Sequence, residues 1–94
     1  MKTFVLFNEF GSFVGEIESE INLALELAGF SERVDDSNVI DLDHDSPGEI
    51  SMTYGIELEG SFSQIRKRFE AARTGAQPYQ PDDPSLHKLV YKEA

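Results

Sequence analysis

The chain has 94 residues, 39% of them hydrophobic, and includes seven Phe and three Tyr, which is typical of one globular domain with a single modest core over 1–94. Its 18 acidic and 8 basic residues leave a formal net charge of −10, which argues against direct nucleic-acid binding because Lys and Arg must contact the phosphates. The absence of cysteine excludes disulfides, thiol catalysis and Cys-ligated metal sites. The N-terminal apolar run is too short for a secretory signal or a membrane span, so we expect a cytoplasmic protein without membrane contact.

The charge is spread unevenly along the sequence. Residues 1–60 contain two basic and fourteen acidic residues, a net charge of −12, whereas residues 61–94 contain six basic and four acidic residues, a net charge of +2. The acidic part favours a basic partner, although a surface of this kind also serves solubility alone.

The first predicted elements are a strand and a helix. Residues 2–10 read as a strand, and the consecutive apolar residues 4–7 indicate contacts on both of its faces. Residues 13–28 have apolar side chains at three- and four-residue spacing, as in an amphipathic helix. Ser12 is a candidate N-cap, and Gly29 is a candidate C-terminal stop.

A hairpin is expected over residues 39–59. Residues 39–43 form a short strand, and the turn at 44–48 contains Pro and Gly. From Glu49 to Glu59, apolar residues alternate strictly with acidic or small ones, which predicts one apolar and one acidic strand face. We expect Ile40 and Leu42 to lie under the helices with the apolar face.

A second helix follows, and then a less regular tail. Ser61 and Gln64 have the spacing of a capping box, and the helix runs to about Arg73. Its basic side chains are expected to form a solvated face (Arg66, Lys67, Arg68 and Arg73). A Pro-rich connector occupies 76–84, and residues 85–92 alternate as in a strand, although a short helix is the other interpretation.

The order strand, helix, strand, strand, helix, strand predicts an α+β, two-layer, ferredoxin-like βαββαβ sandwich, with an antiparallel sheet and both helices on one face. The other face would be open and bordered by acids. It would also expose either Val5 and Phe7 or Phe4 and Leu6 from the first strand, unless the connector or the C-terminal segment covers them. RNA-binding domains of this fold need aromatic and basic residues on that face, which the third strand here lacks.

Catalytic and metal motifs are weak. The run from Asp41 to Asp45 begins like a calcium loop, but Ser46 and Met52 stand where that loop needs Gly and Glu. His44 beside Asp43 and Asp45 offers at most a weak divalent-ion site or a general base without a nucleophile motif. We therefore expect a non-catalytic protein without a cofactor or bound metal.

The remaining hypothesis is a binding protein. Carboxylates two residues apart on a strand are about 6.6–6.8 Å apart, a spacing of the same order as successive phosphates. The acidic surface could therefore imitate nucleic acid and block a nuclease or a nucleic-acid-binding complex, as anti-restriction, anti-CRISPR and nuclease-immunity proteins of this size do. The alternative is a small regulatory or ligand-sensing domain that dimerises through its open sheet face. The residues predicted to contact a partner are Asp35, Asp36, Asp41, Asp43, Asp45, Glu49, Glu57, Glu59 and Phe7.

Overall fold

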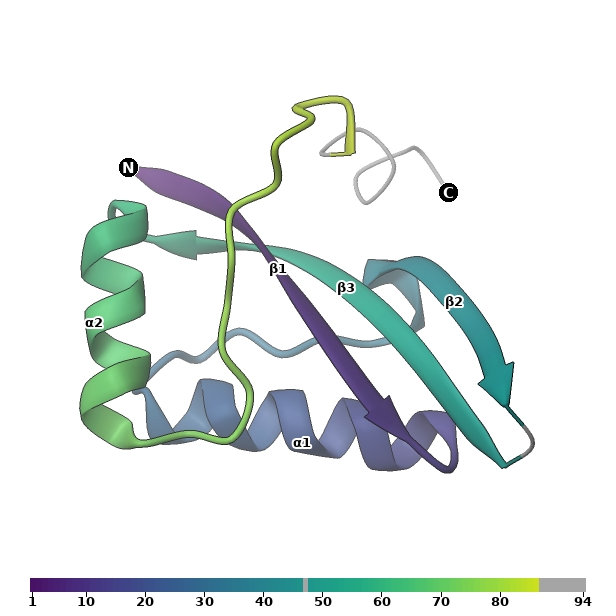
Figure 1. The fold of residues 1–94 in the computed structure, drawn as a ribbon. Helices are drawn as coiled ribbons and strands as arrows, with labels where there is room; N and C mark the ends of the chain where they lie inside the picture. Colours follow the sequence, from purple (N-terminus) through teal and green to yellow (C-terminus); the bar gives the residue numbers. More distant parts are fainter. Residues whose placement is uncertain (47, 87–94) are drawn as a thin grey trace.

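A computed structural model of the chain describes residues 1–46 and 48–86. Three strands form one antiparallel sheet, α1 lies along one side of the sheet, and α2 lies beside the end of the sheet where the chain begins (Figure 1). The element order is therefore β-α-β-β-α, a small α+β fold. The elements are β1 (Lys2–Gly11), α1 (Val14–Leu27), the short 3-10 helix η1 (Asp36–Asn38), β2 (Val39–Ser46), β3 (Glu49–Glu59) and α2 (Phe62–Ala72).

The alternating stretch from Glu49 to Glu59 is the central strand, because the sheet order is β1-β3-β2. Val5 lies opposite Ile56 and Phe7 opposite Tyr54, so cross-strand pairs of apolar residues share one face. Side chains of both helices join these residues in the main core, where Phe69 of α2 lies 5.6 Å from the Phe7 ring. Both helices thus pack on the same face of the sheet, as the sequence predicts.

α1 ends as predicted but begins differently. Gly29 has a φ of 88°, and the amides of Gly29 and Phe30 donate to the carbonyls of Glu26 and Leu25, which is a Schellman ending. At the other end, the prediction that Ser12 caps the helix is wrong. The N-cap is Phe13, which makes no side-chain capping bond, and the Glu16 carboxylate accepts the Ser12 amide at 2.7 Å.

α2 begins with the predicted capping box, in which Ser61 and Gln64 exchange bonds between side chain and backbone. Its basic face is not only solvated, however. Arg68 donates from Nε to the Ala28 carbonyl at 3.0 Å and from Nη2 to the Gly29 carbonyl at 2.7 Å, and its guanidinium lies 3.7 Å from the centre of the Phe30 ring. Arg68 therefore joins α2 to the C-terminal end of α1.

The segment between α1 and η1 is held by one side chain of α1. The side-chain oxygen Oδ1 of Asn22 accepts a hydrogen bond from the backbone N–H of Val34 at 2.7 Å, and its Nδ2 donates to the Val34 carbonyl at 3.1 Å. The side chain therefore pairs with the Val34 backbone as a neighbouring strand would. Val34 is buried at the edge of the main core as a result.

The connector, and not a fourth strand, lies beside β1 in the described residues. Tyr79 exchanges both backbone hydrogen bonds with Leu6, at 2.7 and 2.9 Å, as an isolated antiparallel bridge. In a ferredoxin-like sheet the last strand would occupy this position next to β1. The predicted strand or helix over 85–92 lies mostly outside the described residues, and Ser85 and Leu86 do not belong to a strand.

Two side-chain predictions are wrong, and a third is confirmed only for its strand face. Phe7 is fully buried beneath the helices, so its predicted contact with a partner is wrong, whereas Phe4 and Leu6, one of the two pairs predicted for the open face, do point there. Ile40 packs with Phe4 and Leu6, because a bulge between Val39 and Asp41 turns it to that face. Leu42 is on the helix side but remains 47% exposed, since β2 lies at the sheet edge away from α1 and α2.

Candidate partner-binding surface

The sheet face away from the helices has two different halves. In the first half, near the start of β1, Phe4 and Leu6 are buried and pack with Ile40 and Leu86. In the second half, towards the β2–β3 turn, the outward residues are polar or exposed. We call this second half the hairpin face, and it consists of Asn8, Phe10, Asp41, Asp43, Glu49, Ser51 and Thr53.

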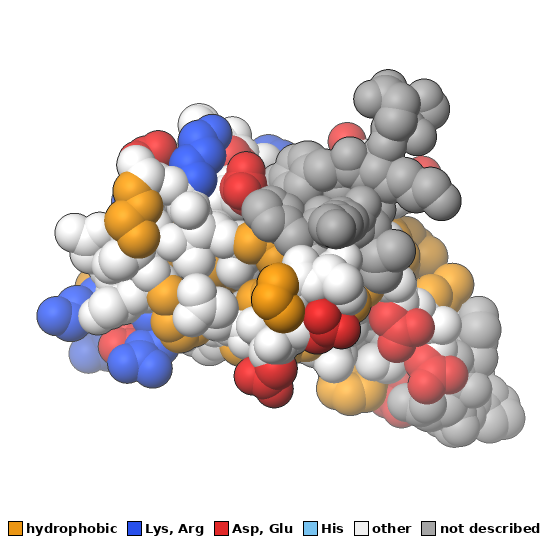
Figure 2. Space-filling view, turned by 90° about the horizontal axis from the view of Figure 1, so that it is seen from above, with side chains coloured by type: hydrophobic (Ala, Val, Ile, Leu, Met, Phe, Trp, Pro, Cys, Tyr) orange, Lys and Arg blue, Asp and Glu red, His pale blue; other side chains and the backbone are white. Residues whose placement is uncertain are grey.

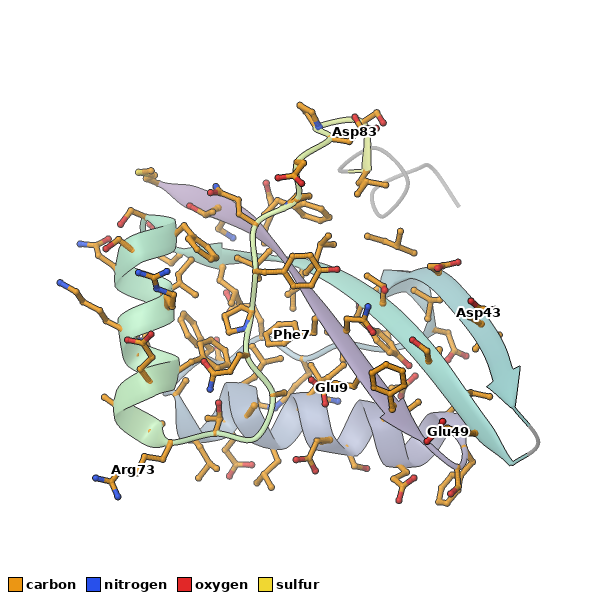
Figure 3. The ribbon with its side chains drawn as sticks, in the orientation of Figure 1. Phe7, Glu9, Asp43, Glu49, Arg73 and Asp83 are labelled. Carbon is orange, nitrogen blue, oxygen red and sulfur yellow. The ribbon has the colours of Figure 1, made fainter. Side chains whose placement is uncertain are left out.

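Two acids of β2 line one side of the hairpin face, and a third lies on the central strand β3 near the turn. Asp41 lies opposite Thr53 and Asp43 opposite Ser51, so both carboxylates project to this face, and Glu49 follows nearer the turn (Figure 3). Asp41 and Asp43 are separated by about 6.6–6.8 Å of strand. All three acids are exposed, and none forms an ion pair with a described residue. In the view of Figure 2, the half of the molecule towards the hairpin shows acidic side chains and no Lys or Arg among the described residues.

An aromatic side chain lies on the other side of the hairpin face. Phe10 of β1 is 62% exposed and lies opposite Ser51, whereas most large apolar residues of β1 are buried. Between Phe10 and Asp43 the floor is made of small polar groups, and the Ser51 hydroxyl donates to Asn8 Oδ1 at 3.2 Å. The surface thus combines an aromatic ring, a shallow polar floor and a row of carboxylates.

Asp35 and Asp36 belong to a different part of the molecule. The Asp35 carboxylate accepts bonds from the amide and hydroxyl of Ser37, and these bonds hold the pKa of Asp35 below its usual value. Asp36 lies near the Tyr54 hydroxyl, which donates to Glu18 at 3.1 Å on the helix side. Burial, the negative charges of Glu18 and Asp36 and the bond to Glu18 raise the pKa of Tyr54. Both aspartates therefore serve the turn before β2, away from the hairpin face.

The other predicted contact residues are also dispersed. Glu57 lies on the open face but in its first half, opposite Phe4. Glu59 pairs with the N-terminal amine at 2.7 Å, and this bond and the amine's charge lower the pKa of Glu59. The Asp45 side chain lies outside the described part of the structure, and Phe7 is unavailable to a partner because it is buried. Of the nine predicted residues, the structure brings together Asp41, Asp43 and Glu49.

One acid near the free edge of β1, Glu9, was not singled out from the sequence. Glu9 projects from β1 towards α1 and is only partly exposed (Figure 3). Burial and the nearby negative charge of Glu20 on α1 raise the pKa of Glu9. Glu9 interrupts the apolar side of β1, and a lone acid on the core-facing side of a strand is the sequence signal that marks such a position.

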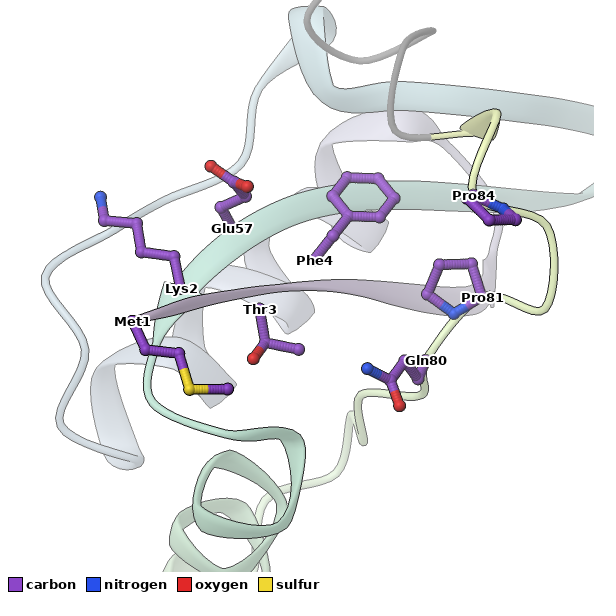
Figure 4. A pocket seen from close by; sticks show the side chains of 8 residues that line it. All are labelled: Met1, Lys2, Thr3, Phe4, Glu57, Gln80, Pro81 and Pro84. Carbon is purple, nitrogen blue, oxygen red and sulfur yellow. The ribbon is translucent and has the colours of Figure 1, made fainter.

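A hollow of about 450 Å³ lies at the start of β1 (Figure 4). Phe4, Pro81 and Pro84 give it apolar walls, and Lys2 and Gln80 add polar groups at its rim. The Thr3 hydroxyl, also at this hollow, donates to the Gly60 carbonyl. The described lining contains no histidine, serine or cysteine.

Among the side chains that the structure describes, no group of three His, Asp or Glu residues is arranged to hold a metal ion. The side chains of His44 and Asp45, which complete the weak ligand cluster seen in the sequence, are outside that part of the chain. Within residues 1–46 and 48–86, no helix is long and apolar enough to cross a membrane.

Comparisons of the chain with protein-family models, with curated proteins and with solved structures found no match.

Proposed function

We propose that this chain is a non-catalytic binding protein whose hairpin face engages a basic surface of another protein. The observation that carries the proposal is the exposed row of Asp41, Asp43 and Glu49, which has no cationic neighbour among the described residues. Carboxylates left without cations repel one another and disfavour the folded state slightly, so a cationic partner would relieve that repulsion.

Two features of the hairpin face support a particular kind of partner. Asp41 and Asp43 have a spacing of the same order as successive phosphates along a nucleic-acid strand. The Lys and Arg residues of a groove that binds such a strand could therefore contact both carboxylates. Phe10 supplies an exposed aromatic ring on which an arginine guanidinium can stack. A nuclease or a nucleic-acid-binding complex is therefore the partner we propose, and the chain would act by occupying its groove. The cytoplasm is the compartment in which we place this encounter.

The dimer hypothesis loses part of its support from the structure. It required apolar β1 residues on the open face, and Phe4 and Leu6 there are already buried. Two copies meeting through the hairpin face would also bring both sets of Asp41 and Asp43 into one interface without adding a cation from that face. Like charges placed together in this way oppose association.

Charge reversal on the hairpin face tests the proposal. We expect the double variant Asp41→Lys/Asp43→Lys to lose partners that the wild-type chain retains from a lysate of its source cell at low salt. The matched control is Glu26→Lys/Asp82→Lys, which changes two exposed acids elsewhere by the same total charge. The control should keep the partners, and salt should elute them, because association between opposite charges is screened by ions.

A defined readout completes the test. A retained partner is purified, and its nuclease or nucleic-acid-binding activity is measured with increasing amounts of wild-type and variant chain. The proposal expects inhibition by the wild type and the control, and at least tenfold weaker inhibition by the hairpin-face variant. Equal behaviour of the two double variants would refute it, because net charge and not the hairpin face would then explain binding.

A further inference from the structure

The outer edge of β1 is closed along one part of the strand and open along another. Leu6 directs its amide and carbonyl away from β3, because both groups bond to Tyr79. Backbone groups that point to the same side recur every second residue in a strand, so Asn8 and Phe10 also direct theirs outward. Neither of these two residues has a backbone hydrogen-bond partner on that side in the described structure.

The connector cannot continue the pairing past Tyr79 in either direction. Pro81 would lie opposite Phe4 but has no amide hydrogen to donate. Gln77 would lie opposite Asn8, but its side chain donates to the carbonyl and hydroxyl of Thr74, both at 3.0 Å, within a turn that leaves β1. The bridge is therefore isolated, and the edge from Asn8 to Phe10 stays unpaired.

This open edge has only part of the usual protection against pairing. Natural edge strands are commonly blocked by Pro, by Lys, by an inward-pointing charge, by a bulge or by a covering segment. The stretch from Asn8 to Phe10 contains no Pro or Lys and its register with β3 has no bulge, so its one protective feature is the inward-facing Glu9, which a basic segment would neutralise. Asn8 and Phe10 are both exposed.

We infer that the β1 edge at Asn8–Phe10 binds an extended, basic peptide segment of a partner protein as an added strand. Asn8 and Phe10 would each exchange an N–H and a C=O bond with that segment, as in other cases of strand addition. The segment is basic because Glu9, which lies between them and faces α1, has Glu20 beside it. A Lys or Arg opposite Glu9 would neutralise this pair, and the peptide residues on either side would lie beside Asn8 and Phe10 on the open face.

This inference goes beyond the proposed function, since it uses the backbone edge of β1 and the acids towards α1, and not Asp41 and Asp43. A seven-residue peptide of alternating Val and Lys, blocked at both ends, is the probe. A scrambled peptide of the same composition that contains N-methylated residues, and so cannot pair, is its control. Binding is measured by titration followed with backbone amide NMR signals, at low and high salt.

The decisive variants are Phe10→Pro and Phe10→Ala. Both remove the aromatic ring, but only proline removes the outward amide hydrogen, and an edge position without a ladder bond on that side tolerates proline. We expect Phe10→Pro to bind the probe at least tenfold more weakly than Phe10→Ala. Equal affinity of the two variants would overturn the inference.

Amide hydrogen exchange in the wild-type chain provides a second test, which does not depend on the folding of a variant. The amides of Asn8 and Phe10 should exchange rapidly alone and become protected at least tenfold by saturating probe, while Glu9 changes little because its amide already faces β3. Unchanged exchange at Asn8 and Phe10 would also overturn the inference. The variant Asp41→Lys/Asp43→Lys should still bind the probe, so failure of the hairpin-face proposal and failure of the strand addition give different results.

Discussion

Replacing Arg68 by alanine should destabilise the fold although the residue is on the surface. The change removes two hydrogen bonds, to the carbonyls of Ala28 and Gly29, and the contact of the guanidinium with the Phe30 ring. A hydrogen bond to a charged group contributes roughly 1.5–3 kcal/mol, and an exposed cation–π contact roughly 0.5–1 kcal/mol. Because water can replace the lost donors at the freed carbonyls, we expect a net loss of about 2 kcal/mol in the free energy of unfolding.

Urea unfolding followed by circular dichroism measures this loss. With a slope near 2 kcal/mol/M, as expected for a small domain, the midpoint should fall by about 1 M. Arg68→Lys keeps the charge but not the planar fork, so it should lose about half as much stability. The matched control is Lys67→Ala, one residue away and exposed, which should stay within about 0.5 kcal/mol of the wild type. If Arg68→Ala and Lys67→Ala unfold at the same urea concentration, Arg68 does not stabilise the end of α1.

Three further predictions concern stability. Asn22→Ala should lower the free energy of unfolding by about 2 kcal/mol, because it leaves the backbone amide and carbonyl of Val34 without partners. Urea unfolding measures this loss, and a loss no larger than that of Leu23→Ala, at an exposed neighbouring position, would contradict the prediction. Glu9→Gln should raise stability at pH 7 and have no effect below about pH 4. Because the pKa of Glu9 is raised in the folded state, protonated Glu9 contributes fully to stability below its unfolded pKa, and this contribution is lost as pH rises through its folded pKa. Equal thermal midpoints of the wild type and Glu9→Gln at pH 7 would contradict this prediction. Leu86→Ser should uncover Phe4 and Leu6, lower stability by about 1 kcal/mol and increase binding of a hydrophobic dye, and an unchanged dye signal would show that Leu86 does not cover them.

Local patterns predicted most of the elements. The strict alternation from Glu49 to Glu59 is confirmed as β3 with the same bounds, and the capping box at Ser61 marks the beginning of α2. Gly29 ends α1 through its left-handed backbone. Each of these signals acts within a few residues of the chain, so it does not depend on how distant elements pack.

Signals that depend on packing were not readable in the sequence. Four consecutive apolar residues in β1 fit either register, so the face of Phe7 was ambiguous until its neighbours were known. The bulge at Val39–Asp41 turns the Ile40 side chain to the open face of the sheet, and no Gly or Pro in this stretch indicates a bulge in the sequence. Arg68 looked like a solvated cation because its carbonyl partners at Ala28 and Gly29 lie about forty positions earlier.

The candidate surface was predicted in composition but not in extent. Sequence alone grouped all acids of the first sixty residues, whereas the fold distributes them over a turn, two strand faces and α1. The alternation of side chains in a sheet explains why Asp41 and Asp43 stay together, since they share one strand face. Glu9 and Phe10 are adjacent in sequence but project to opposite faces of β1. The distribution of charge along the sequence therefore does not show that they belong to different surfaces.

The position of the prolines explains why β1 retains both a closed and an open edge. Tyr79 lies between Pro78 and Pro81, and it is the connector residue that exchanges both backbone bonds with β1. A regular fourth strand would have covered the edge from Phe4 to Phe10 and left no backbone group for a partner. The connector instead secures β1 at Leu6, where the buried Phe4 and Leu6 need shielding, and leaves the outer backbone groups of Asn8 and Phe10 unpaired. The open edge of β1 and the carboxylates of β2 lie on opposite edges of the sheet with β3 between them, so an added strand would find its complementary charge in Glu9 and Glu20 and not in Asp41 and Asp43.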